Sequence, residues 1–175
     1  AMRLPDNSDV RLTKWERVAV IVRVLVPWLV AFQAVEYLGA PRDAMPVPRV
    51  PGEPTWPVIP FTEAFYVLAY PLVIGAPFLA YRASDLRRFA TAGLIATAMI
   101  IPFYLLVPLT FEAKGVPEDS PWSWLLHLER AGDAPVTAFP AFHVVWTLIA
   151  AEVLVARWPR ARAFIAVFVV AVAVS

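Results

Sequence analysis

The chain of 175 residues contains no cysteine, which excludes disulfide bonds, thiol nucleophiles, iron–sulfur clusters and thiolate-bound zinc. It has only 6 glycines, too few for close helix packing through glycine repeats or for a glycine-rich loop around a phosphate. Charged residues make up only 17% of the chain, where soluble domains have about 25%. Because the formal net charge is +1, no global field attracts a polyanion, and we expect no nucleic-acid partner.

Apolar residues, by contrast, are abundant. They make up 60% of the chain, against roughly 45–50% in soluble domains, and the mean hydropathy is +0.65. A small soluble domain leaves much of its chain exposed, so it could not hide this much apolar surface from water. The composition therefore indicates a single membrane domain over residues 1–175 and excludes a typical cytosolic domain or a disordered chain.

Long apolar runs predict where the chain crosses the membrane. A helix needs about 20 residues to cross roughly 30 Å of hydrocarbon. We expect spans over residues 18–38, 61–81, 89–109, 138–156 and 163–175. The fifth run is still apolar at Ser175 and too short to cross, so we expect the chain to be part of a longer bundle. The predicted fold is an all-α, polytopic transmembrane helix bundle.

Basic residues predict the orientation of these spans. Ten of the fifteen lie before the first span, between the second and third, or between the fourth and fifth: Arg3, Arg11, Lys14, Arg17, Arg82, Arg87, Arg88, Arg157, Arg160 and Arg162. Parity puts these three segments on one side of the membrane, and the positive-inside rule makes that side cytoplasmic. We therefore predict a multi-pass protein of the cell membrane, with its N-terminus in the cytoplasm and loops 39–60 and 110–137 outside.

The two outer loops differ in character. The first contains seven prolines, so we expect it to be extended and stiff. In the second, Ser120 is typical of an N-cap and is followed by a proline suited to the first helical position. Trp122, Leu125 and Leu126 then share one helical face, which predicts a short helix at the water–lipid boundary.

His143 is the candidate catalytic residue because it lies near the outward end of the fourth predicted span. We expect Thr137 to be the N-cap of this helix and Pro140 to fall in its first turn. The unpaired N–H groups and the helix dipole make such an end a site for anions. An imidazole beside a bound phosphate can donate a proton to a leaving oxygen or attack phosphorus. A structural histidine that bonds to a neighbouring helix fits the position equally well.

The segment Phe139-Pro140-Ala141-Phe142-His143 resembles the second signature of the type 2 phosphatidic acid phosphatase superfamily. That signature reads Phe-Pro-Ser-Leu-His in the branch related to inositol phosphorylceramide synthases. The run 101–109 is similar to the end of the third helix in that branch, and the order of outward loop, motif, helix and basic turn is similar as well. The resemblance covers about residues 61–175.

This resemblance implies six transmembrane helices, a site at the outer membrane surface, and no metal or other cofactor. It implies a lipid phosphatase or phosphotransferase in which His143 is the general acid for the leaving alcohol. The histidine nucleophile belongs to a third signature, which we expect after Ser175. Two departures stand out, because Ala141 replaces the serine that donates to phosphate, and the first signature, Lys-x6-Arg-Pro, is not met after Lys114.

The remaining candidates for binding the lipid phosphate lie in the second outer loop or in the motif itself. They are Lys114, His127, Arg130, Ala141 and Phe142. For the three loop residues the alternative is an ordinary solvated charge. Glu36 and Glu63, near the outward ends of the first two spans, either line the headgroup pocket or extend to the interface.

Two other functions stay open at this point. A non-enzymatic transporter or lipid-binding module is suggested by the prolines and acidic residues within the spans. A degenerate member of the superfamily, kept as a structural partner, is suggested by Ala141 and the missing first-signature arginine. Membrane lipids are the expected partners under every interpretation.

Overall fold

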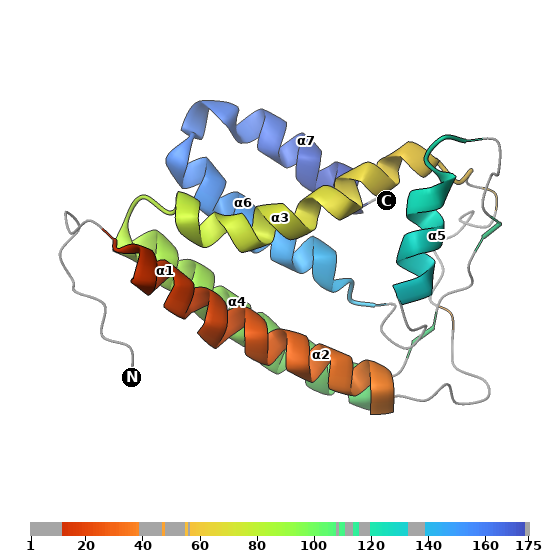
Figure 1. The fold of residues 1–175 in the computed structure, drawn as a ribbon, viewed down its shortest axis with the longest axis horizontal. Coiled ribbons are helices and arrows are strands. Elements are labelled where there is room, and N and C mark those ends of the chain that lie inside the picture. The colour runs from red at the N-terminus through yellow and green to blue at the C-terminus, as the bar shows by residue number, and fades with distance from the viewer. Residues whose placement is uncertain are drawn as a thin grey trace.

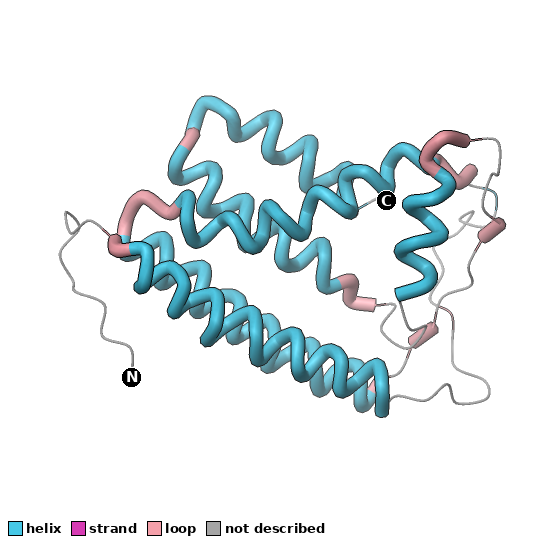
Figure 2. Tube along the Cα trace, in the orientation of Figure 1, coloured by secondary structure: helices cyan, strands magenta, loops and turns pink. Residues whose placement is uncertain are grey.

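The computed structural model describes residues 12–38, 47, 55, 57–107, 109–110, 114–115, 120–132 and 139–173, and this part of the chain is helical, without strands (Figure 2). The elements in chain order are α1 (Lys14–Val20), the π-helical turn η1 (Ile21–Leu25), α2 (Val26–Leu38), the 3-10 turn η3 (Pro60–Thr62), α3 (Glu63–Leu79), α4 (Ala83–Leu106), α5 (Ser123–Gly132), α6 (Phe142–Arg157), the 3-10 turn η4 (Pro159–Ala161) and α7 (Arg162–Ala173).

The first three elements form one continuous rod (Figure 1). It begins with a capping box, in which the Thr13 hydroxyl accepts the Glu16 N–H at 3.2 Å and the Glu16 carboxylate accepts the Thr13 N–H at 2.7 Å. The wide turn η1 ends two residues before Pro27, which has no N–H to offer to the carbonyl of Arg23. The rod therefore continues past a proline without breaking.

Helix α6 occupies the centre of the bundle. It packs against α3, α4 and α7, while the rod lies along α4 (Figure 1). Helix α5 lies at one end of the bundle, where it contacts η3 and α3. This arrangement surrounds the start of α6 with helices from earlier parts of the chain.

Three helical stretches are long and apolar enough to cross a membrane: Lys14–Tyr37, Pro60–Leu79 and Ala83–Leu106. They correspond to the first three predicted spans. Helices α6, with 16 residues, and α7, with 12, lie in the fourth and fifth predicted runs. Both are shorter than the roughly 20 residues that a span needs, so their crossing of the membrane stays a prediction.

The helix boundaries differ from the predicted ones in three places. Helix α4 begins at Ala83 and not at residue 89, because the Asp85 carboxylate accepts the Arg82 N–H at 3.2 Å and caps an earlier start. The two arginines 87 and 88 therefore lie within α4 and not in a connecting turn. Helix α6 begins four residues later than predicted, and α5 begins at Ser123, two residues after the expected position.

The outer helix α5 shows part of the predicted amphipathic face. Leu125 and Leu126 are buried, each 7% exposed, whereas Trp122 is 41% exposed and Trp124 is 61% exposed. The N–H of Trp122 donates to the Ser120 hydroxyl at 3.3 Å in the turn before the helix. Because α5 begins at Ser123, Ser120 is not its N-cap, and that prediction was wrong. Two leucines hold α5 to the bundle, while its tryptophans face outward.

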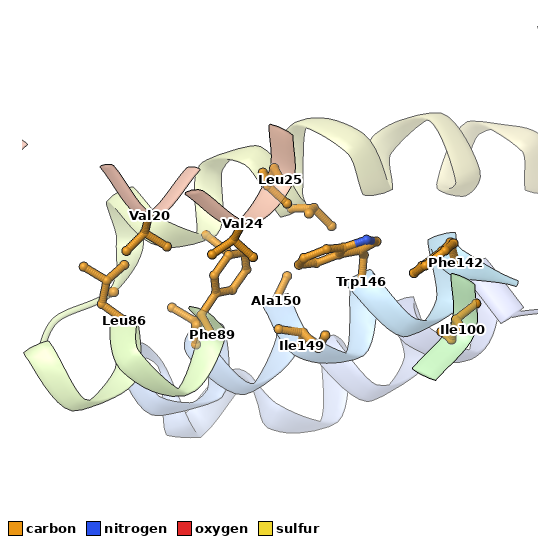
Figure 3. Close-up of a cluster of buried hydrophobic side chains, with 14 of the residues drawn as sticks. Val20, Val24, Leu25, Leu86, Phe89, Ile100, Phe142, Trp146, Ile149 and Ala150 are labelled. Carbon is orange, nitrogen blue, oxygen red and sulfur yellow. The ribbon is translucent and has the colours of Figure 1, made fainter. Parts of the chain in front are cut away.

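Trp146 of α6 lies at the centre of the main hydrophobic core (Figure 3). Its ring centroid is 5.5 Å from that of Trp28 and 5.8 Å from that of Phe89. The backbone of α4 approaches this indole at Gly93, where an added Cβ would lie 2.5 Å from Trp146 Cη2 and 2.8 Å from Val24 Cγ1. Although glycines are few, this one is needed for close contact between α4, η1 and α6.

The described parts of the three basic segments, from residue 12 on, come together at one end of the bundle, at the left of Figure 1. Arg17 Nη1 donates to the carbonyls of Pro77 at 2.9 Å, Ala80 at 3.0 Å, and Phe78, and so joins α1 to the C-terminal end of α3. The guanidinium of Arg157 lies 5.2 Å from the ring centroid of Tyr81, which joins the α6–α7 turn to the α3–α4 turn. The topology predicted from the basic residues, including the cytoplasmic side of this end, stays a prediction.

Candidate functional site

His143 is the second residue of α6, at the end of the bundle away from the basic segments (Figure 1). Ala141 is the N-cap, with φ −69° and ψ 114°, and its methyl group caps no backbone N–H. The predicted N-cap, Thr137, lies outside the described residues, and Pro140 precedes the helix, so its placement in the first turn was wrong. The first-turn N–H groups of α6 still lack intrahelical partners, and His143 lies among them.

The ring of His143 packs against α3. Its centroid is 4.7 Å from that of Tyr66, with the ring planes at 72°, an edge-to-face contact. The Tyr70 hydroxyl, one turn further along α3, donates to the Tyr66 hydroxyl at 2.7 Å. His143 itself is half-buried. The imidazole is therefore held in one orientation by a buried tyrosine and retains exposed surface.

Glu63 belongs to the same side of α3, one turn before Tyr66. Its side chain is only 2% exposed, so it does not extend to the interface as one of the two predicted alternatives required. It lies in the first turn of α3, where the helix dipole favours a negative charge. An acidic residue, a tyrosine pair and a histidine thus come from the facing sides of α3 and α6.

The start of α6 is fixed on its other side by aromatic contacts. Phe142 is 4% exposed, and its ring centroid lies 5.6 Å from Trp28, 5.6 Å from Phe32 and 5.7 Å from Tyr104. The Tyr104 hydroxyl donates to the carbonyl of Pro140, directly before the N-cap. Phe142 therefore packs into the core while His143, one residue on, faces α3. The role of Phe142 in substrate binding stays a prediction.

The loop candidates are less well placed by the structure. Lys114 is half-buried in the segment after α4, and His127 is exposed on α5. The side chain of Arg130 lies outside the described residues. The structure shows Tyr66 as a ring partner of His143. Glu36, the other acidic candidate, is half-buried and accepts the side-chain N–H of Gln33 at 2.8 Å.

Metal ligands do not gather at this site or elsewhere in the described part of the chain, where no group of three or more His, Cys, Asp or Glu residues could hold an ion. Near the start of α6, the groups that could contact a phosphate include backbone N–H groups and the imidazole of His143. Ala141 offers no hydroxyl at the N-cap, where a serine could bond to the backbone or to a bound anion.

Tyr66 and Tyr70 were not among the residues predicted from the sequence. The signal was present, since Glu63, Tyr66 and Tyr70 follow the 3–4 spacing of one helical face within an otherwise apolar helix. Polar side chains in such a stripe usually face the interior of a bundle. Which helix they face depends on tertiary packing, and only the structure gives α6 as that partner.

Comparison with known proteins adds no neighbour. No protein-family model, curated protein or solved structure matches this chain. The interpretation of the site therefore depends on its own residues and geometry.

Proposed function

We propose that the protein is an integral-membrane lipid phosphatase or phosphotransferase that acts on a phosphate ester of a lipid headgroup. The observation that carries the proposal is the position of His143, half-buried in the first turn of α6 and packed edge-to-face on Tyr66. The motif around His143, with its resemblance to the second signature of the type 2 phosphatidic acid phosphatase superfamily, supports the same activity.

The start of α6 supplies what a phosphate needs. Backbone N–H groups of the first turn and the positive end of the helix dipole favour an anion at this point. With the phosphate bound there, the imidazole of His143 donates its proton to the oxygen of the leaving alcohol as the phosphorus–oxygen bond breaks. The edge contact with Tyr66 limits rotation of the ring and keeps its nitrogen atoms directed to one place.

The acceptor of the phosphoryl group decides between the two reactions. Water as acceptor gives a phosphatase, and an alcohol such as inositol gives a transferase. In the proposed mechanism the nucleophile is a second histidine, as the resemblance implies, and no metal ion takes part. The site faces the outside if the basic end lies in the cytoplasm, as the positive-inside rule predicts.

The test uses the complete gene product, reconstituted in phosphatidylcholine vesicles that contain phosphatidate. Phosphate release and headgroup transfer to inositol are both measured. His143→Gln removes the titratable group at similar size, and we expect turnover to fall by about 10²–10⁴-fold. Thr97→Val is the matched control, because the Thr97 hydroxyl on α4 donates to the Gly93 carbonyl of its own helix, and turnover should not change.

The melting temperature of each variant is measured alongside activity, so that loss of folding is separated from loss of chemistry. Undiminished turnover in a folded His143→Gln protein would refute the proposed role. Substrate-dependent flux without phosphate release, unaffected by that substitution, would identify a transporter. A folded wild-type protein without either activity would overturn the proposed function.

A further inference from the structure

The basic end of the bundle carries an ordered arginine between two aromatic rings. The guanidinium carbon of Arg157 lies 5.2 Å from the ring centroid of Tyr81 and 5.8 Å from that of Trp158. Tyr81 lies in the α3–α4 turn and Trp158 directly follows α6, so two connections far apart in the sequence form this arrangement. All three side chains are exposed, Tyr81 to 67% and Trp158 to 46%.

Positive charge dominates this end among the described residues. The cations are Lys14, Arg17, Arg82, Arg87, Arg88, Arg157, Arg160 and Arg162. The nearby carboxylates, Glu16 and Asp85, both accept backbone N–H groups at the starts of their own helices. These two carboxylates and the exposed Glu152 of α6 offset only part of the positive charge, and the segment 157–162 contains no acidic residue. The end as a whole presents a cationic surface.

The arrangement around Arg157 suits a phosphate group as its ligand. An arginine stacked on aromatic rings keeps its N–H edges outward, and its planar fork matches two oxygens of a phosphate. Tyrosine and tryptophan prefer the headgroup level of a membrane, which places Arg157 at the depth of lipid phosphates. Arg160 follows in η4, where Pro159 restricts the backbone and the arginine side chain is exposed.

We propose that Arg157, held between Tyr81 and Trp158, forms with Arg160 a binding site for the phosphate of an anionic phospholipid at the basic end. This site is separate from His143, which lies at the opposite end of α6, and it does not depend on the proposed enzymatic activity. The bound lipid would join the α3–α4 turn to the α6–α7 turn and hold the ends of these helices at the membrane surface.

The test is native mass spectrometry of the purified protein in a neutral detergent, titrated with phosphatidylglycerol or phosphatidylcholine. We expect tighter binding of phosphatidylglycerol, and a loss of about fivefold in that affinity for each arginine removed, in Arg157→Gln and in Arg160→Gln. Arg157→Lys keeps the charge but loses the planar fork, so it should also weaken binding. Tyr81→Leu, which removes one ring and no charge, should also weaken the binding of phosphatidylglycerol.

Arg23→Gln is the matched control, because Arg23 is an exposed arginine within η1. This substitution removes the same charge at another place. An equal loss in this variant would overturn a localised site and leave only diffuse attraction. Equal affinity for the two lipids would overturn the proposal as well. Displacement of phosphatidylglycerol by millimolar inorganic phosphate would show that the ligand is a free anion and not a lipid. Arg160→Gln, on an exposed turn, keeps the test decisive if Arg157→Gln does not fold.

Discussion

Substitution of Gly93 by alanine tests the packing of the core directly. The new Cβ would lie 2.5 Å from Trp146 Cη2, 2.8 Å from Trp146 Cζ3 and 2.8 Å from Val24 Cγ1, whereas carbon atoms prefer about 3.5–4.0 Å. The indole cannot move away easily, because it is 2% exposed and contacts the rings of Trp28 and Phe89. The overlap must therefore be relieved by shifting helix backbones.

The expected effect follows from two opposing contributions. Overpacking a tight core costs about 1–3 kcal/mol, and three overlapping atoms place this case near the upper value. Alanine recovers roughly 1 kcal/mol through its better helix propensity. The net loss is then about 2 kcal/mol, which corresponds to a fall in Tm on the order of 4–8 °C for a chain of this size.

Gly75→Ala provides a control of the opposite sign. Gly75 lies within α3, and a Cβ there meets no atom within 4 Å. Only the better helix propensity of alanine then affects stability, and the Tm should rise by roughly 2–4 °C. Both variants are measured by thermal unfolding in detergent, followed by tryptophan fluorescence. An increase for Gly93→Ala similar to that for Gly75→Ala would refute the reasoning. The double variant with Trp146→Phe should show favourable coupling of at least about 0.5 kcal/mol.

Two further predictions concern helix ends. Arg17→Met removes the donor to three carbonyls at the end of α3, and because one nitrogen has only two hydrogens we expect a loss of about 3 kcal/mol in unfolding free energy. Arg17→Lys should lose less of the unfolding free energy. Equal stability of the methionine variant and the wild type would contradict the capping role. Ala141→Ser adds an N-cap hydroxyl to α6, which should raise stability by about 0.5–2 kcal/mol in the same thermal assay. An unchanged or lower Tm would show that the N-cap geometry is wrong.

Much of this architecture follows from the hydrophobic pattern. Apolar runs of sufficient length predicted the three long helices, because the bilayer requires both a minimum length and internal backbone hydrogen bonds. Boundaries were less accurate, because a cap such as Asp85 at the start of α4 extends a helix beyond the apolar run. The late start of α6 agrees with the restriction that Pro140 places on the residue before it.

The candidate site was predictable only in part. The position of His143 near the start of a helix followed from the apolar run and the motif around it, while its catalytic role stays a prediction. The contact with Tyr66 could not, because it depends on which face of α3 packs against α6. The importance of Gly93 was also missed, since a count of glycines says nothing about where one backbone must approach an indole. Long-range contacts of this kind are not encoded in local spacing.

The contact made by Arg17 also constrains the order in which the protein is built. Its carbonyl partner at Pro77 lies 60 residues later in the chain, so the contact cannot exist while the ribosome is still making α3. During that interval the guanidinium must be satisfied by water or by lipid headgroups. The first helix therefore completes this contact only after α3 has been synthesised.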